Sequence, residues 1–504
     1  MVSAPSLLEP VSADAPPERL RPGLGREAGQ TTRVRFWLPA VAVYVGAFLA
    51  QTWTLGKVML PSVDEGVYLY VARLILDGKV PYRDFFISHP PWEFLGAAGG
   101  LWVTGGDVPA FSVFYAAWVL LALFPIYRTV ASLTGRLLPA FWAVVLFVTY
   151  PDFARWDARF FALRQASVPF LALGVDLALR GKRPALAGSL LGVFAACVIP
   201  NVPIALLVLA GLVLFGSEGG PGDVARSVRQ QKRLLFSFVL TAGALYGVAF
   251  AIPGAPWDLV LFQFGRPRAP ILERLLNVWT DSLPASAVLL LLGFFGAFLV
   301  FRASRGISLA AAAGFLLGLL AYNYYSAHHL ASVVPLMAIS AGVAFSIVSR
   351  GRTAEIVASA GLALALGVTA LPALKGPLID ARSPNLFRVV QELEACREPV
   401  FTAQPLYALH AGRRLTFHRF AADMRSFRVS NLPPFSDEDF ADVVSRSNTV
   451  LLEPLLFTML TPARMQLLAG QFAIRFQDPE HGILVRRSPP PGPGTAPSAP
   501  AGPK

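Results

Sequence analysis

The chain has 504 residues, of which 55% are hydrophobic and only 15% are charged. This composition, with a mean hydropathy of +0.55, excludes a soluble globular domain and indicates an integral membrane protein. The formal net charge of +12 does not indicate a nucleic-acid partner, because most Lys and Arg residues lie in short loops between apolar runs, where membrane orientation accounts for them.

The first three quarters of the chain read as a membrane domain. Residues 1–35 form a basic arm without the apolar core of a signal peptide, so we expect a disordered cytoplasmic segment. From residue 36 to residue 372, apolar runs long enough to cross about 30 Å of hydrocarbon alternate with polar loops. The pattern predicts an α-helical polytopic bundle of about eleven transmembrane helices. The spans are expected near residues 37–55, 110–127, 137–150, 160–179, a pair broken at Pro200 and Asn201, 234–252, a span ending near Arg302, two spans around "YNYYSAHH", and a last span to about Leu371.

Basic loops predict the orientation of these spans. The segments "RGKR", "ARSVRQQKR" and "SRGRTAE" all fall on one side of the predicted map. Because Lys and Arg concentrate in cytoplasmic loops, we expect a multi-pass protein of the inner (plasma) membrane with its N-terminus in the cytoplasm. Asn201 is expected to face the outside, and the spans are expected to be nearly free of buried charge.

The chain changes character after the last span. Residues 373–487 alternate short apolar runs with charged helical stretches, which predicts a small extracytoplasmic α/β domain. The segments "PVFTA", "TVLLEP" and "GILVRR" are expected to be strands, and "NLFRVVQELEACR" and "TPARMQLLAGQF" are expected to be helices. Residues 488–504 are rich in proline and are expected to be a disordered tail.

The loop after the first span carries the most informative motif. "VDEGVYLYVARLILDGKVPYRDFFISHPP" runs from Val63 to Pro91 and begins with an acidic pair, Asp64 and Glu65. Acidic residues are common in the first turn of a helix, so the pair alone indicates little. The residues that follow are spaced as in a helix that lies along the membrane surface, with one apolar face. That face consists of Val67, Tyr70, Val71, Leu74 and Ile75.

This loop resembles the first external loop of the GT-C superfamily of lipid-linked sugar transferases, of the protein O-mannosyltransferase and aminoarabinose transferase type. Such enzymes carry an Asp-Glu pair after the first span and then a run similar to "YVARLILDGKVPYRDFFISHPP". The late segment "YNYYSAHHLASVVPLMAISAG" is similar as well, and a final external α/β domain is common in the superfamily. The resemblance implies the GT-C fold and a glycosyltransferase that moves a sugar from a polyprenyl-phosphate donor to an acceptor hydroxyl on a lipid, glycan or protein, usually with inversion.

The resemblance also implies roles for particular residues. Asp64 corresponds to the catalytic base of the Asp-Glu motif, and Glu65 supports or orients it. A departing phosphate needs cations, and Arg266 and Arg268 could clamp one or could bind anionic lipid headgroups instead. The set of expected substrate or phosphate contacts is Arg83, Asp84, His89, Asp157, Arg266, Arg268, His328 and His329.

Several alternatives stay open at this stage. Asp64, Glu65, Asp84 and His89 are chemically suited to a divalent metal, but their spacing matches no rigid ligand motif. A nucleotide sugar is not expected as the direct donor, because the sequence has no Gly-rich nucleotide loop. A lipid or sugar transporter (flippase) would also be polytopic, although transporters place substrate groups at mid-bilayer. A non-catalytic scaffold would assign no special role to Asp64.

Overall fold

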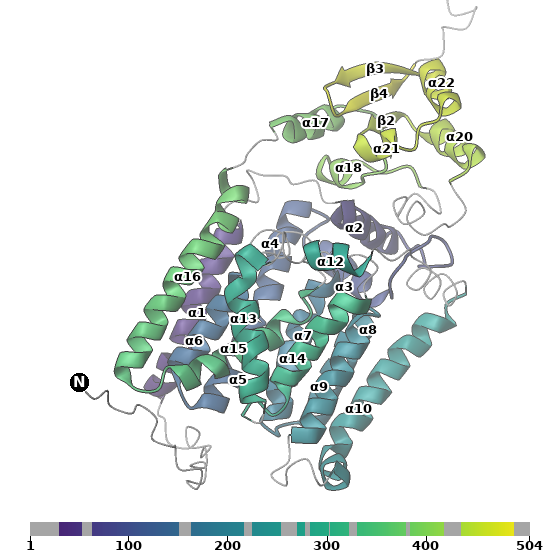
Figure 1. Ribbon diagram of the computed structural model, residues 1–504. Helices are drawn as coiled ribbons and strands as arrows, with labels where there is room; N and C mark the ends of the chain where they lie inside the picture. Colours follow the sequence, from purple (N-terminus) through teal and green to yellow (C-terminus); the bar gives the residue numbers. More distant parts are fainter. Residues whose placement is uncertain are drawn as a thin grey trace, which may run out of the picture.

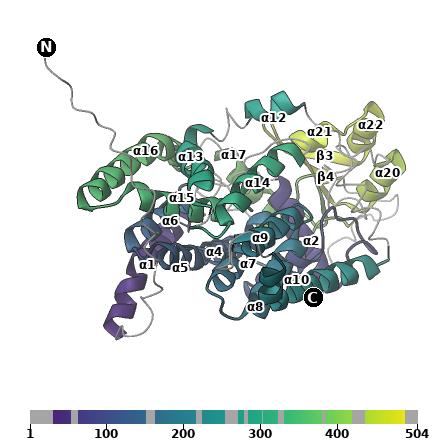
Figure 2. The ribbon, with the colours of Figure 1, turned by 60° about the horizontal axis from the view of Figure 1, so that its bottom comes forward.

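The computed structural model describes residues 30–52, 63–150, 163–215, 224–253, 270–277, 283–301, 303–321, 330–379, 384–417 and 435–487. Long helices form a bundle, and a smaller unit of strands and short helices lies at one end of it (Figure 1). When the lower end of the bundle is turned forward, α1 and α16 lie at one side of the bundle, and α8 and α10 lie at the other (Figure 2). The bundle helices are α1 (Gln30–Thr52), α4 (Val108–Leu120), α5 (Leu123–Thr134), α6 (Leu137–Val148), α7 (Leu163–Leu179), α8 (Pro184–Cys197), α9 (Asn201–Phe215), α10 (Val224–Ala251), α13 (Leu283–Val300), α14 (Ile307–Ala321), α15 (Val334–Val348) and α16 (Arg352–Ile379).

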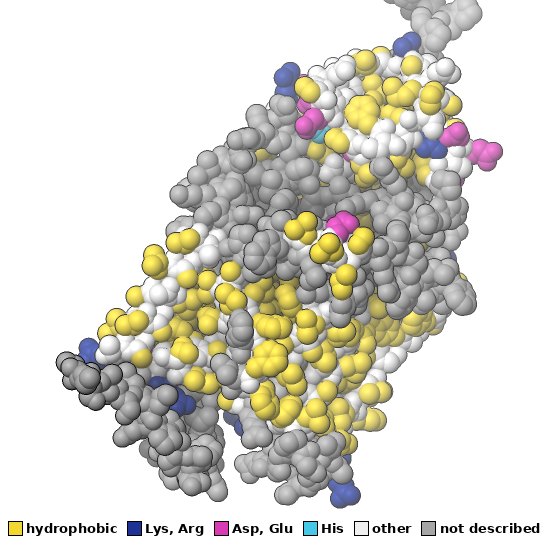
Figure 3. Space-filling model, viewed as in Figure 1, with side chains coloured by type: hydrophobic (Ala, Val, Ile, Leu, Met, Phe, Trp, Pro, Cys, Tyr) yellow, Lys and Arg dark blue, Asp and Glu magenta, His cyan; other side chains and the backbone are white. Residues whose placement is uncertain are grey.

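The expected spans fall on these helices. Three helical stretches, 108–134, 231–251 and 352–369, are long and apolar enough to cross a membrane. Six shorter apolar stretches add to them, within α6, α8, α9, α13, α14 and α15. An apolar band covers the visible face of the bundle, with Lys and Arg side chains at its lower end (Figure 3). The predicted helical membrane bundle is therefore present, while the number of spans stays a prediction.

Glycines allow the bundle helices to approach one another closely. A Cβ atom on Gly192 of α8 would lie 2.9 Å from the Thr241 Cβ of α10, and one on Gly342 of α15 would lie 2.9 Å from the Ala143 Cβ of α6. Membrane helices gain little from excluding lipid, so close packing at small residues is a main source of their association. These contacts hold α8 against α10 and α6 against α15, and α8 in turn contacts the helix of residues 92–103.

The C-terminal unit contains a four-stranded sheet in the order β1-β2-β4-β3. Strand β1 (Val400–Phe401) runs parallel to β2 (Thr449–Leu452), and β4 (Gly482–Arg486) pairs antiparallel with β2 and with β3 (Phe472–Gln477). The expected strands are β1, β2 and β4, whereas β3 was not expected. The helices of this unit are α17 (Pro384–Glu394), α18 (Leu406–His410), α20 (Asp437–Arg446), α21 (Pro454–Phe457) and α22 (Pro462–Gln471).

Helix α2 (Val63–Leu76) lies between the bundle and the C-terminal unit, where it packs against α3 (Trp92–Val103) and α18. The apolar face expected to lie on the membrane surface is instead covered by protein. Val67, Tyr70, Val71 and Leu74 are each less than a tenth exposed. This face therefore packs against protein and not against lipid, because the sequence pattern shows that a face is apolar and not what covers it. A position of α2 along the membrane surface stays a prediction.

The contact between α2 and α18 depends on a glycine, Gly66, which has no side chain. A Cβ atom on Gly66 would lie 2.7 Å from the Leu406 backbone nitrogen and 2.9 Å from the Leu406 Cβ. Helix α18 is fixed in turn by Tyr407, whose hydroxyl lies 3.0 Å from His481 Nε2. His481 Nδ1 lies 3.2 Å from Asp478 Oδ1 in the turn before β4. The sheet thus holds α18 against α2.

The substitution Gly66→Ala is expected to destabilise the protein by roughly 1–3 kcal/mol, because the added methyl group overpacks a contact with backbone atoms. The measurement is the midpoint of thermal unfolding of the detergent-purified protein. Gly96→Ala in α3 is the matched control, since nothing lies within 4 Å of its Cβ position. The control should be neutral or stabilising by up to about 1 kcal/mol. Equal midpoints for both variants would show that α2 and α18 do not pack this closely.

Candidate active site

The loop between α2 and α3 is a rigid turn. The Tyr82 backbone N–H donates to the Phe85 carbonyl oxygen at 2.8 Å, and the Tyr82 hydroxyl donates to the His89 carbonyl oxygen at 2.7 Å. Tyr82 is only 1% exposed and has a φ of 64°, a left-handed conformation that residues other than glycine adopt rarely. The loop therefore holds Arg83, Asp84 and His89 at fixed positions beside α2.

Asp64 and Glu65 occupy the first turn of α2 and have different environments. Asp64 is partly exposed, whereas Glu65 is only 2% exposed. Each of the two residues has an interaction partner within the protein. The two carboxyl groups therefore differ in exposure, while their roles as base and supporting residue stay predictions.

Arg83 and Asp84 form an ion pair with each other. The Arg83 Nε and Nη2 atoms each lie 2.9 Å from a carboxylate oxygen of Asp84, and the Val80 backbone N–H donates to Asp84 Oδ2 at 2.7 Å. These hydrogen bonds lower the pKa of Asp84 to about 2. Asp84 therefore stabilises the turn, while the Arg83 side chain stays 56% exposed and accessible to an anion.

His89 lies at the junction of α2 and α3. Its ring centroid is 6.1 Å from that of Tyr68 in α2, and Tyr68 packs in turn against Phe94 of α3 at 5.7 Å, both in edge-to-face geometry. Aromatic pairs in this geometry add to the stabilisation from burial. His89 thus has a packing role, whatever contact it makes with a substrate.

Glu93, in the first turn of α3, is a buried carboxyl group that the sequence analysis did not identify. It is 6% exposed, and among the described residues neither of its oxygens has a hydrogen-bond partner. Burial raises the pKa of Glu93 well above its usual range, and Cys197 of α8 and Arg164 of α7 only partly oppose the rise. The carboxyl group is therefore protonated over a wider pH range than an exposed one.

A buried polar network connects three bundle helices near Glu93. The Asn201 side-chain amide donates to Ser167 Oγ at 3.0 Å and to the Phe194 carbonyl oxygen at 2.9 Å, and its own oxygen accepts from the Ser332 hydroxyl at 2.7 Å. Asn201 is fully buried and therefore has partners within the protein, while its position on the outer side of the membrane stays a prediction. Sequence could not find this network, because its members are far apart in the chain.

Five of the expected site residues lie outside the described part of the chain. They are Asp157, Arg266, Arg268, His328 and His329, and their roles stay predictions. Within the described ranges, no three His, Cys, Asp or Glu side chains come together as metal ligands. The structure thus brings Arg83, Asp84 and His89 together with the helix that carries Asp64 and Glu65.

The substitution Glu93→Gln is expected to stabilise the protein at pH 8 by roughly 1–3 kcal/mol, because an uncompensated buried carboxylate is costly. A raised folded-state pKa means that stability from this group is greatest below about pH 4.3 and is lost as the pH rises. The stability gap between variant and wild type should therefore widen from pH 5 to pH 8 in thermal unfolding. The control is Glu394→Gln at an exposed position, which should show no such gap. A variant that is less stable at pH 8 would mean that Glu93 is charged and paired.

Comparison with known proteins identifies the fold. No family model matches the sequence, and no curated protein matches it. Among solved structures, ArnT from Cupriavidus metallidurans in the apo state matches with a TM-score of 0.65 at 13% identity, over 90% of this chain and 98% of that one. ArnT bound to undecaprenyl phosphate matches with a TM-score of 0.63 at 12% identity, over 91% and 98%. An oligosaccharyltransferase from Archaeoglobus fulgidus gives only 0.46 at 13% identity, over 88% and 73%, too low to compare the folds. The chain therefore has the fold of ArnT, an aminoarabinose transferase of the GT-C superfamily, as the resemblance of its first loop predicted.

Proposed function

We propose that this protein is a membrane glycosyltransferase that moves a sugar from a polyprenyl-phosphate donor to an acceptor hydroxyl, with inversion at the anomeric carbon. The observation that carries the proposal is the position of the Asp64–Glu65 pair. It starts a helix held between the bundle and the C-terminal unit, next to the rigid turn with Arg83 and His89. The fold agrees with this proposal, because one ArnT structure of the same fold binds undecaprenyl phosphate.

The reaction needs a base and a stabilised leaving group. In the proposed step, the Asp64 carboxylate takes the proton of the acceptor hydroxyl, and the acceptor oxygen forms a bond to the anomeric carbon. The bond from that carbon to the phosphate oxygen breaks, and polyprenyl phosphate leaves with the electron pair. Glu65, which is buried behind Asp64 in the same helical turn, orients the turn that carries the base.

Cations near the departing phosphate lower the energy of this step. The exposed guanidinium of Arg83 lies in the same turn as His89, and a guanidinium can bind phosphate through two parallel hydrogen bonds. Arg266 and Arg268, with His328 and His329, complete the proposed set of phosphate and acceptor contacts. Asp157 is proposed as a further acidic residue of the site, and a divalent metal stays an alternative source of positive charge.

The C-terminal unit is proposed to help select the acceptor. Its helix α18 packs directly on α2, so an acceptor that reaches Asp64 passes close to this unit. The basic ends of the bundle helices lie away from it (Figure 3), which supports a cytoplasmic basic end and an active site on the outer face of the inner membrane. The acceptor is a lipid, a glycan or a protein hydroxyl.

A transporter would place ionisable groups near the middle of the bilayer. Among the described residues of the bundle helices, Asp176 is a fully buried carboxylate and is an exception to the expectation of spans nearly free of buried charge. Asp176 lies in the last turn of α7 and is paired with Arg128 and Arg180. A carboxylate at a helix end that two guanidiniums already neutralise has a structural role, and it does not favour transport.

The substitution Asp64→Asn is expected to reduce the transfer rate by about 100-fold or more, because it removes the general base with little change in volume. The measurement uses purified protein in nanodiscs and a panel of radiolabelled polyprenyl-phosphate sugars, with product formation and donor binding followed separately. The rate should fall while donor binding persists.

Asp77→Asn is the matched control for this experiment. Asp77 follows α2 in the same loop, is 57% exposed and pairs with Arg73 at 3.8 Å, so its loss should leave the rate within about twofold of wild type. If Asp64→Asn keeps full activity, the base must be another carboxylate. If no donor reacts or binds to the wild type, the glycosyltransferase proposal itself is wrong.

A further inference from the structure

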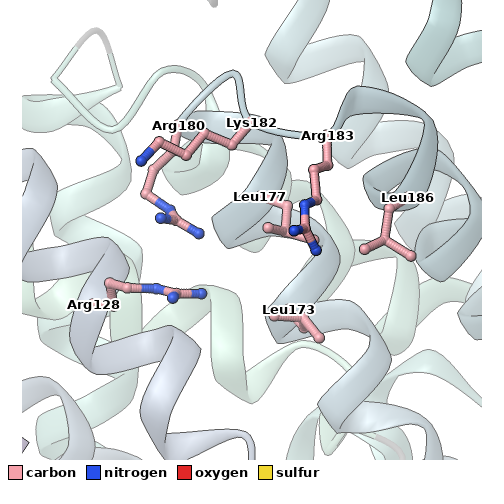
Figure 4. A pocket seen from close by; sticks show the side chains of 7 residues that line it. All are labelled: Arg128, Leu173, Leu177, Arg180, Lys182, Arg183 and Leu186. Atoms are coloured by element: carbon pink, nitrogen blue, oxygen red, sulfur yellow. The ribbon is translucent and has the colours of Figure 1, made fainter.

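A cavity of about 390 Å³ lies where the loop between α7 and α8 faces α5 (Figure 4). Four cationic side chains line it: Arg128 from α5, and Arg180, Lys182 and Arg183 from the loop between α7 and α8. Three leucines, Leu173, Leu177 and Leu186, form its apolar walls. The cavity is therefore lined by both cationic and apolar side chains.

The cavity carries an excess of positive charge. Asp176, which is fully buried, accepts hydrogen bonds from Arg128 Nε at 3.1 Å and from Arg180 Nη2 at 2.8 Å. This single carboxylate offsets one of the four cations and fixes two guanidiniums at the cavity wall. Among the described residues, the Lys182 and Arg183 side chains have no ion pair or hydrogen bond. They are exposed and available to an anion.

The backbone conformation of Arg183 also indicates that its side chain is available to bind an anion. Arg183 precedes α8 with φ 53° and ψ 57°, a left-handed conformation, and its side chain does not cap the helix. Glycine or asparagine would adopt this conformation at lower cost. In Figure 4 the Arg183 side chain extends between Leu177 and Leu186. Strained backbone conformations cluster at functional positions, such as residues that bind ligands. The conformation of Arg183 is therefore consistent with a binding role for its side chain.

The apolar walls distinguish a lipid from a soluble anion. Leu186 is 42% exposed on a helix of the membrane bundle, so this wall continues into the surface that meets lipid tails. A free phosphate would gain nothing from three leucines, whereas a phospholipid can place its phosphate against Lys182 and Arg183 and its acyl chains along α8. Basic cavities between membrane helices near the bilayer surface are suited to such headgroups.

We propose that this cavity is a binding site for an anionic phospholipid in the leaflet at the basic end of the bundle. Lys182 and Arg183 bind the headgroup phosphate, and Leu173, Leu177 and Leu186 contact the first part of the acyl chains. This lipid is distinct from the polyprenyl-phosphate donor, because the cavity lies at the other end of the helices that support Asp64. Its binding to α5, α7 and α8 stabilises the bundle.

Arg136, at the same end of the bundle, differs from Lys182 and Arg183 because it binds other groups of the protein. Arg136 donates to the carbonyl oxygens of Ser346 and Ser349 at 2.9 Å and 2.6 Å and also pairs with Glu355. Its hydrogen-bonding capacity is used within the protein. Nearby, Arg350 and Arg352 are exposed and line no part of the cavity, which makes them suitable controls for charge alone.

The test compares the double variant Lys182→Gln/Arg183→Gln with the control Arg350→Gln/Arg352→Gln, which removes the same charge at the same end of the bundle. Both leave the Asp176 ion pairs intact. Binding of phosphatidylglycerol to the delipidated, detergent-purified full chain is measured by native mass spectrometry and by thermal stabilisation, with phosphatidylcholine as the neutral lipid. At about fivefold per cation, the cavity variant should bind phosphatidylglycerol roughly 30-fold more weakly, and the control should bind it within about twofold of wild type.

Three outcomes would overturn the proposal. Equal losses in both double variants would mean that the basic end attracts anionic lipid without a specific site. Competition by millimolar inorganic phosphate would mean that the cavity takes a soluble anion. Equal stabilisation by phosphatidylcholine, or loss of polyprenyl-phosphate binding in the cavity variant alone, would also contradict a site specific for anionic phospholipid.

Discussion

The close contact between Gly66 and Leu406 is the constraint on which the candidate site depends. Helix α2 carries Asp64 and Glu65 in its first turn. The residue after them, Gly66, packs against the backbone nitrogen and the Cβ atom of Leu406 in the C-terminal unit. The position of the acidic pair is therefore set from both sides, by α3 and the bundle below and by α18 above. A catalytic group held in this way loses little entropy when a substrate binds, which is how a rigid support contributes to catalysis.

The buried polar groups of the bundle follow from the same physics as its apolar surface. Hydrocarbon offers no hydrogen-bond partners, so a polar side chain inside the bundle must find its partner in the protein. Asn201 meets this need with Ser167 and Ser332 at one end, and Asp176 meets it with two arginines at the other. Glu93 has no hydrogen-bond partner among the described residues, and loss of its charge lowers the cost of its burial without supplying one.

Sequence predicted the elements better than their contacts. Hydropathy located the helices of the bundle, and short buried runs located β1, β2 and β4, because burial in lipid or in a sheet leaves a local pattern. Strand β3 was missed because only Phe472 and Phe476 of its six residues are buried, as expected of an edge strand. The burial of Glu93 and the hydrogen-bond network of Asn201 were missed because their environments come from helices distant in sequence. The loop motif identified the fold because its residues are contiguous.

The two ends of the bundle have different physical requirements, and the chain meets them with different residues. At the end near the C-terminal unit, carboxylates and a rigid turn lie together, in the positions that the proposed transfer from a lipid-linked donor requires. At the other end, cations exceed carboxylates around an apolar cavity, which suits attraction without reaction. Helices α7 and α8 connect the two ends, since α7 carries Ser167 near its start and Asp176 near its end. The proposed lipid, by ordering α7 at one end, would therefore also restrain the helix that carries Ser167 of the buried polar network at the other.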